Sequence, residues 1–175
     1  MKKAVLVVII LFFVQSLTAQ QQQEKQCPCC SESHNSFDFW IGDWTVYDVK
    51  GKVIGTNTIE KQYDNCVLQE KWTSSGKSRG TSYNYYDRKD STWNQIWVDN
   101  SGFSLLLKGN YSNGKMILKS DLLKGKNGSY YNQITWTKSA DGSVTQVWDI
   151  LNEENKKTQE AFRGIYKKTV KTSEK

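Results

Sequence analysis

Three polar side chains interrupt the apolar faces of predicted strands, and they are the first candidates for binding chemistry. Side chains alternate between two faces of an extended strand, so Glu70 shares a face with Leu68 and Trp72. Asn132 and Gln146 lie in the middle of similar apolar sets. An unpaired polar group in a dry core costs roughly 2–7 kcal/mol, and an ionised glutamate costs more. Polar residues at these places therefore favour a lined cavity over a packed core.

The expected ligand-binding residues combine polar groups that would orient a ligand with aromatic groups that would form the walls. The polar set is Glu70, Asn84, Asn132 and Gln146, and the aromatic set is Trp72, Tyr86, Trp97 and Trp148. The pattern suggests a small, partly apolar or aromatic ligand of unknown identity.

Two alternatives to a cavity remain at this level. The polar groups could satisfy one another inside a filled barrel, or a slip of one residue could reverse every face. The alternation does not decide which face of the predicted strands 79–87 and 92–99 points inward. Either Asn84 and Tyr86 or Tyr83 and Tyr85 point inward, and Trp93 and Trp97 share a face with Gln95 and Asp99.

Catalytic and metal-binding patterns are weak. The single histidine, His34, precedes the predicted strands, so a Ser-His-acid triad would have to reach it there. Cys27, Cys29, Cys30 and His34 supply soft ligands, but their spacing differs from the separated pairs of zinc sites. We expect no metal and no cofactor.

The enzymatic alternative uses Glu70 as a general acid or base, with a pKa raised by burial.

The cysteines predict disulfides if the chain is exported. A bridge from the N-terminal cluster to Cys66 would hold the leader across one end of the barrel, and Cys30 is the expected partner because it lies nearest the folded body. Such a bridge closes a loop of about 35 residues and could contribute roughly 3–4 kcal/mol. Cys27 and Cys29 either pair with each other or stay reactive.

The N-terminus has the features of a signal peptide over residues 1–19. Lys2 and Lys3 precede the apolar run Ala4 to Val14, and Ala19 offers a small residue for cleavage. That run is shorter than the roughly 20 residues that cross a bilayer. We therefore expect cleavage, export to the periplasm or beyond, and no membrane span in the mature protein. The alternative is an uncleaved membrane anchor. The expected segments that follow are a polar, cysteine-containing leader at 20–36, a barrel domain at 37–167 and a basic disordered tail at 168–175.

The net charge of +6 gives no support for nucleic-acid binding. Without Lys2 and Lys3 the chain has 22 basic and 18 acidic residues. The end from Lys167 carries four lysines and Glu174, so the folded body is near +1. A nucleic-acid-binding domain is expected to carry a basic stripe. The predicted partner is a small molecule, and we expect a monomer.

The elements that must position these residues are short strands separated by turn signals, a pattern typical of barrels and sandwiches. Asn113-Gly114 and Asp141-Gly142 predict tight hairpins in which both central residues have positive φ. A long meander tends to close because closure removes exposed edges. We expect an all-β, closed, antiparallel up-and-down barrel of about ten strands, with a short helical lid or plug at 36–41. The predicted strands are 43–49, 53–62, 66–73, 79–87, 92–99, 104–110, 115–122, 129–138, 143–151 and 158–167.

The run FDFWIGDW at residues 37–44 resembles the opening motif of an uncharacterised family of exported bacterial proteins with calycin-like barrels. Further matching positions include Gly55, Gly80, Gly109, the Trp97-Val98-Asp99 run and the Ile134-Thr135-Trp136 run, and the resemblance covers nearly all of 37–167. It implies a lipocalin-like barrel and supports a bridge from a leader cysteine to Cys66. The family has no assigned activity, and fold alone does not fix function.

Gly42-Asp43-Trp44 is also similar to the Gly-x-Trp at the start of lipocalin barrels. The resemblance implies a tryptophan packed at the closed end under an arginine of the last strand. Arg163 is the candidate arginine, although the alternation places it opposite Phe162 and Tyr166, facing outward. The chain is similar to nitrobindin barrels in strand number but lacks the barrel histidine that their haem requires.

Overall fold

The computed structural model describes residues 27–126 and 128–170. The expected signal peptide, the leader up to Gln26, and the tail from Lys171 lie outside the described residues. In the described part no helix is long and apolar enough to cross a membrane.

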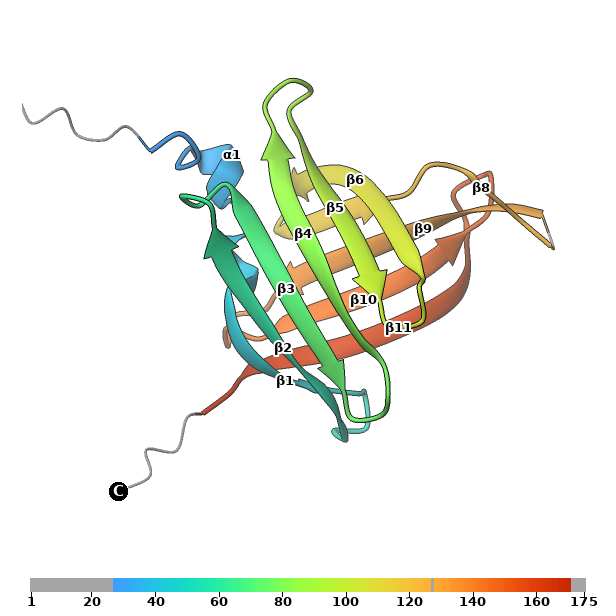
Figure 1. Cartoon of the computed structure of the whole chain (residues 1–175). Coiled ribbons are helices and arrows are strands. Elements are labelled where there is room, and N and C mark those ends of the chain that lie inside the picture. The colour runs from blue at the N-terminus through green and yellow to red at the C-terminus, as the bar shows by residue number, and fades with distance from the viewer. Residues whose placement is uncertain (1–26, 127, 171–175) are drawn as a thin grey trace, which may run out of the picture.

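Ten antiparallel strands close into a barrel, and one short extra strand extends it (Figure 1). The ring follows chain order from β1 to β7 and continues through β9, β10 and β11, which pairs with β1. The short β8 pairs with β9 alone. The elements are α1 (Glu32–Asn35), η1 (Asp38–Trp40), β1 (Gly42–Tyr47), β2 (Val53–Gln62), β3 (Val67–Ser74), β4 (Arg79–Asp87), β5 (Thr92–Asp99), β6 (Ser104–Ser112), β7 (Lys115–Lys119), β8 (Leu123–Gly125), β9 (Gly128–Lys138), β10 (Val144–Leu151) and β11 (Lys157–Lys168). The predicted fold class is confirmed; β8 was not expected.

The two hairpin signals form different turns. Asn113 and Gly114 both have positive φ, at 50° and 78°, as a type I′ turn requires. At Asp141-Gly142 only the glycine does, with φ of 81°. There Ser139 and Ser143 pair through their backbones, and the Asp141 carboxylate accepts from the Ser143 amide at 2.9 Å. The expectation of two positive φ values is therefore wrong for this turn, because the loop is one residue longer.

The alternation of buried and exposed residues follows the predicted faces. On β3, Leu68 and Glu70 are buried, whereas Lys71 is exposed. On β4, Asn84 is buried and Tyr83 is 43% exposed, which settles the orientation that the sequence left open. The parity of β3 and β4 is therefore kept in the barrel, whereas register shifts interrupt the pairing of β1 with β2 and of β10 with β11.

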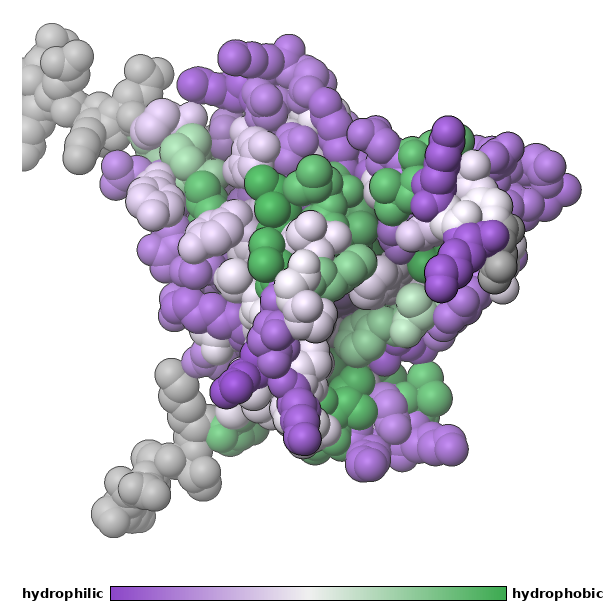
Figure 2. Space-filling model, turned by 45° about the vertical axis from the view of Figure 1, so that its right-hand side comes forward, coloured by the Kyte–Doolittle hydropathy of each residue, from purple (hydrophilic) through white to green (hydrophobic). Residues whose placement is uncertain are grey.

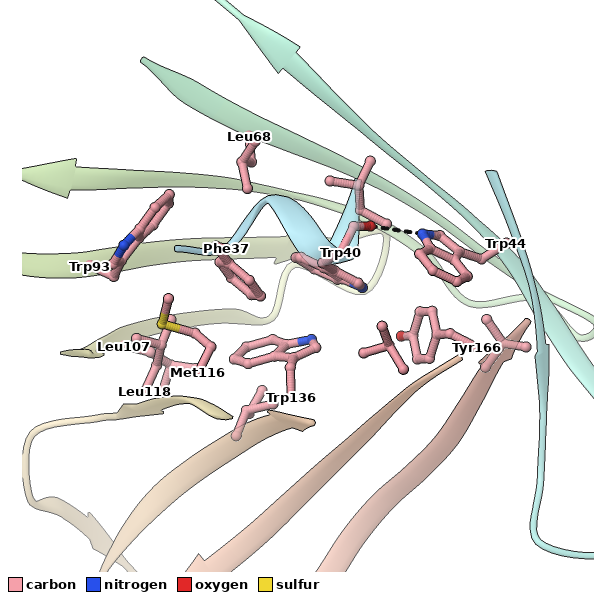
Figure 3. Packing of buried hydrophobic residues seen from close by; sticks show 14 of the residues in the cluster. Phe37, Trp40, Trp44, Leu68, Trp93, Leu107, Met116, Leu118, Trp136 and Tyr166 are labelled. Atoms are coloured by element: carbon pink, nitrogen blue, oxygen red, sulfur yellow. Dashed lines mark hydrogen bonds between the residues drawn. The ribbon is translucent and has the colours of Figure 1, made fainter. Parts of the chain in front are cut away.

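A short plug fills one end of the barrel. Phe37 and Trp40, from the segment around η1, are fully buried and stack on each other with ring centroids 5.0 Å apart (Figure 3). The ring of Trp136 on β9 lies 5.1 Å from Phe37 and 5.3 Å from Trp40. The Trp44 indole donates a hydrogen bond to the Trp40 carbonyl at 2.8 Å. The plug expected at 36–41 is thus present, and it makes this half of the interior a packed aromatic core.

The last strand covers Trp44 with a lysine rather than an arginine. The Lys168 ammonium lies 3.8 Å from the Trp44 ring centroid and donates to the Ile41 carbonyl. Arg163, the residue suggested by the lipocalin resemblance, instead pairs with Glu160 at 2.6 Å. The lysine was missed because it was assigned to the tail, whereas β11 continues to Lys168 and pairs it with Trp44.

The disulfides join Cys29 to Cys66 and Cys27 to Cys30. A leader cysteine does bond Cys66, but the expected choice of Cys30 is wrong. Neighbouring side chains point in different directions, and Cys29 is the buried one, at 8% exposure, whereas Cys30 is exposed. Proximity along the chain was therefore a poor guide to the partner.

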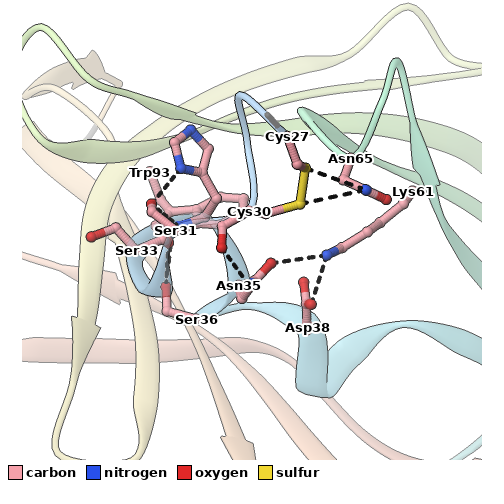
Figure 4. Close-up of polar contacts among 11 residues, drawn as sticks. Cys27, Cys30, Ser31, Ser33, Asn35, Ser36, Asp38, Lys61, Asn65 and Trp93 are labelled. Atoms are coloured by element: carbon pink, nitrogen blue, oxygen red, sulfur yellow. Dashed lines mark hydrogen bonds and ion pairs between the residues drawn. A yellow bond between two sulfur atoms is a disulfide. The ribbon is translucent and has the colours of Figure 1, made fainter. Parts of the chain in front are cut away.

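Polar contacts fix the leader across the plug end (Figure 4). Lys61 bridges Asn35 and Asp38 at 3.1 and 2.7 Å. The Trp93 indole donates to the Ser33 carbonyl and to the Ser36 hydroxyl at 3.0 and 2.9 Å. From Cys27 onward the leader is thus a folded cap.

The long-range disulfide should stabilise the fold more than the local one. The Cys29–Cys66 bond spans 37 positions and the Cys27–Cys30 bond spans 3. Loop-closure entropy then gives about 4 kcal/mol for the first bond and about 2 kcal/mol for the second. Urea unfolding of a Cys29→Ala/Cys66→Ala variant should show the larger loss, with Cys27→Ala/Cys30→Ala as the matched control. Equal losses from the two pairs would contradict this placement of the cap.

Candidate functional site

A cavity of about 280 Å³ lies in the half of the barrel that the plug leaves empty. Strand β3 starts at the plug end and β4 returns to it, so Trp72 and Ser78 lie toward the open end. The volume is near the lower limit of roughly 300–1,000 Å³ for small-molecule sites. The lining residues are Glu70, Trp72, Ser78, Gln95, Trp97, Asp99, Phe103, Leu105, Ile134, Gln146, Trp148, Ala161, Phe162 and Tyr166.

Aromatic side chains from five strands or loops form the walls. Trp72 meets Phe162 edge to face, with ring centroids 6.1 Å apart. Trp148 stacks with Phe103 at 6.2 Å and an interplanar angle of 23°. Contacts of this kind hold the rings in place without a ligand, so the walls are pre-organised.

Two glycines create the space in which the wall tryptophans lie. A Cβ at Gly55 would be 2.6 Å from the Trp72 ring, and one at Gly80 would be 2.3 Å from the Trp97 ring. Each indole therefore extends over the backbone of the neighbouring strand. Both indoles line the cavity, and the face of an indole is a surface that binds flat or cationic groups.

The floor of the cavity is a hydrogen-bond network centred on Glu70. One carboxylate oxygen accepts from the Asn57 amide at 2.7 Å, and the other accepts from the Ser82 hydroxyl at 2.6 Å. Asn84 donates to the Ser82 oxygen at 2.9 Å and accepts from Gln95 at 2.7 Å. Strands β2, β3 and β5 thus contribute one inward polar residue each, and β4 contributes two, to a continuous network.

A second pair completes this layer from the other side. The Tyr166 hydroxyl donates to the Gln146 side-chain oxygen. Its oxygen lies 3.5 Å from the Asn57 amide nitrogen, which links the pair to Glu70 through Asn57. The polar layer therefore covers β2 to β5, β10 and β11, whereas the paired inward residues on β6 and β9, Leu107 and Trp136, are apolar. It lies between the packed half and the hollow half.

Burial dominates the electrostatics of the floor. Glu70 is only 5% exposed, and desolvation raises the pKa of its carboxyl group, although the hydrogen bonds from Ser82 and Asn57 act in the opposite direction. Desolvation and the nearby Glu70 charge also raise the pKa of Tyr166 well above its usual value. The Asn57 side-chain oxygen is buried without a hydrogen-bond partner in the described part of the chain. The network is thus short of positive charge and of one donor.

Five of the eight predicted ligand-binding residues line the cavity, and three do not. Those in the lining are Glu70, Trp72, Trp97, Gln146 and Trp148. Asn84 lies behind the floor, where it holds Ser82 and Gln95. Asn132 also lies behind the surface and accepts from the Trp148 indole at 2.8 Å. Tyr86 lies at the plug end, 5.1 Å from the His34 ring, so its assignment to the cavity is wrong.

Several lining residues were not predicted. Gln95 and Asp99 share the inward face of β5 with Trp97. The sequence shows that these residues lie on one face of the strand, but it does not show that this face points inward. Phe162 and Tyr166 both point inward from β11, separated by Gly164, whose missing Cβ leaves room for the Phe162 ring at 2.9 Å. The inward residue Asn57 was not predicted. Polar residues lie on both faces of β2 around it, so the sequence pattern does not mark the inward face.

Two other hollows have less chemistry. A hollow of about 580 Å³ beside β8 is larger, but its described lining residues include no acidic group and only one aromatic group, Tyr130. A hollow of about 200 Å³ at the cap lies between Ser36, Tyr86, Trp93 and Tyr111. The open-end cavity is the candidate site because it alone of these hollows combines an aromatic wall with a buried carboxylate.

The outer wall carries an apolar row rather than a pocket. Tyr83, Ile96 and Leu106 pair across β4, β5 and β6, and they are 43%, 40% and 63% exposed. Figure 2 shows apolar residues gathered at the centre of one face and framed by hydrophilic ones. Ile96 and Leu106 offer apolar area alone, and the Tyr83 hydroxyl accepts a hydrogen bond from Gln69 at 3.3 Å.

Comparisons with protein-family models and with curated proteins find no match. The resemblance of residues 37–44 to an uncharacterised exported family therefore stays a prediction. The described residues contain no group of three His, Cys, Asp or Glu side chains arranged to bind a metal ion. The four cysteines are consumed in disulfides, which removes the alternative of a thiolate site with His34.

Filling the space at Gly80 should disturb the cavity wall. In Gly80→Ala the new Cβ would lie 2.3 Å from Trp97 Cζ2 and 2.8 Å from the Val98 carbonyl oxygen. We expect the free energy of unfolding to fall by about 1–3 kcal/mol and the fluorescence of the displaced indole to change. The control is Gly76→Ala, where the nearest atom would be 3.6 Å away. If the two variants are equally stable, Trp97 does not lie over Gly80.

Proposed function

We propose that the protein binds a small, partly apolar or aromatic molecule in the open-end cavity. The observation that carries this proposal is a hollow with tryptophan walls above a buried polar floor. A barrel built only for stability would gain by filling this space with apolar side chains, since burying Glu70 and its neighbours is costly. The plug end of the same barrel is filled in that way, with Phe37, Trp40 and Trp136.

Export is part of the proposal. The signal-like N-terminus and the two disulfides support an oxidising compartment, because structural disulfides are rare in reducing cytosol. The protein would then act as a periplasmic or secreted carrier, and the cap bonded to Cys66 would keep the plug in place outside the cell.

An enzyme using the same cavity is the second candidate. The observation that favours it is Glu70, a buried carboxyl group with a raised pKa, which suits a general acid or base. Both of its oxygens accept hydrogen bonds from neutral partners, which fix the orientation of the carboxyl group. Glu70→Gln separates the candidates: lost turnover with retained binding indicates an enzyme, and a change of affinity alone indicates a carrier.

The native mass of the mature protein, purified from the organism that makes it, tests the proposal. We expect a discrete excess over the denatured mass, because a pre-formed cavity should retain its ligand. Trp148→Leu, which removes a wall ring, should lower the affinity for the recovered molecule by at least about tenfold, or about 1.4 kcal/mol.

The matched control is Tyr83→Leu on the outer wall, where the ring is 43% exposed and remote from the lining. It should bind as the parent protein does. Equal native and denatured masses, together with equal affinities of the Trp148 and Tyr83 variants for any molecule that binds, would contradict a ligand in this cavity.

A further inference from the structure

The cavity contains negative groups and no positive ones. Glu70 lies at the floor and Asp99 at the mouth, and none of the described residues in the lining is lysine, arginine or histidine. Hydrogen bonds from Ser101 lower the pKa of Asp99, which keeps this carboxylate ionised. The site therefore offers a ligand two acidic groups and no cationic partner.

The basic residues of the nearby strand β11 are engaged elsewhere. Lys157 pairs with Asp149 at 2.7 Å and with Glu160 at 2.8 Å. Arg163 forms a two-point contact with the same Glu160, at 2.7 and 2.6 Å. These ion pairs hold the cations away from the lining, so the negative potential of the cavity is left without compensation.

Glu70 has unused capacity for hydrogen-bond donors. A carboxylate oxygen can accept more than one hydrogen bond, and each oxygen here accepts one, from Asn57 or Ser82. Both partners are neutral. A buried carboxylate with neutral partners alone is unfavourable, and a positive charge nearby would stabilise it. The missing partner is therefore a cation with N–H donors.

The walls suit the same kind of group. Indole is the most favourable aromatic ring for a cation, and three indoles, Trp72, Trp97 and Trp148, line the cavity. Gly55 and Gly80 leave the space that the Trp72 and Trp97 rings occupy in the wall. The aliphatic or aromatic remainder of a ligand would contact Leu105, Ile134 and Phe162.

We propose that the ligand is a small organic ammonium ion, a protonated amine attached to an apolar or aromatic group. Its nitrogen would donate to Glu70 at the floor, Asp99 would attract it at the mouth, and the tryptophan faces would surround it. This inference rests on the proposed function, since it specifies the chemical class of the molecule held in the same cavity.

Three probes of equal shape and different charge test the class. Isothermal titration at pH 7 would compare 2-phenylethylamine, 2-phenylethanol and phenylacetate, which are cationic, neutral and anionic. We expect the amine to bind at least about tenfold more tightly than the alcohol, a difference of about 1.4 kcal/mol, and phenylacetate to bind weakest. Trimethyl(phenyl)ammonium, a cation without N–H donors, should bind less tightly than the amine, because Glu70 can accept no hydrogen bond from it.

Substitutions of Glu70 and Asp99 test which acidic residue causes the preference for the amine over the alcohol. Glu70→Gln should bring the amine and the alcohol to within about threefold while the alcohol still binds, because the shape of the cavity is kept. Asp99→Asn should reduce the ratio less. The matched control is Glu60→Gln, an exposed acid on the outer face of β2 that pairs with Lys71 at 2.9 Å, and it should leave the ratio unchanged.

The outcomes separate this inference from the proposed function. If the alcohol or phenylacetate binds as tightly as the amine, the ammonium class is wrong and the binding cavity stands. If no probe binds and the native and denatured masses agree, both are overturned. Should Glu70→Gln fail to fold, Asp99→Asn decides: an unchanged ratio of amine to alcohol in that folded variant contradicts the inference.

Discussion

The burial of Glu70 in the middle of the barrel is the constraint on which the rest of the structure depends. A carboxylate at 5% exposure needs donors, and Asn57 and Ser82 supply them from the two neighbouring strands. Ser82 is fixed in turn by Asn84, and Asn57 lies beside the Tyr166 hydroxyl, so inward polar residues of neighbouring strands meet at this height. This polar layer is buried at a cost that its hydrogen bonds reduce. It divides the interior into an aromatic half closed by the plug and a hollow half that opens to solvent.

Each half is stabilised by a different device. At the plug end the chain inserts Phe37 and Trp40, closes over them with the leader and bonds Cys29 to Cys66. At the open end stability comes from the hydrogen-bonded ring of strands, while glycines at 55 and 80 withdraw the wall so that the tryptophans leave a cavity. The plug end is thus packed and cross-linked, whereas the open end keeps unfilled space.

Local alternation predicts most of this fold, and long-range pairing accounts for what it misses. The inward positions Glu70, Trp72 and Gln146 follow from parity alone, because one buried face fixes the register of a strand. Parity does not say how far along the barrel axis a residue lies, so Tyr86 was placed in the cavity although it lies at the cap. Likewise, Lys168 covers Trp44 only because β11 pairs with β1, a contact between the two ends of the domain that no local pattern reveals.

The carbon-13 chemical shift of the Glu70 carboxyl group, followed through a pH titration without and with a saturating ammonium ligand, tests the central claim most directly. Without ligand, we expect Glu70 to titrate above the ordinary range of glutamate, because desolvation raises its pKa and no cation opposes it. With 2-phenylethylamine bound, the pKa should fall as the ammonium group stabilises the carboxylate. An ordinary or lowered pKa in the free protein, unchanged by the amine, would contradict the claim that an uncompensated buried carboxylate organises this site.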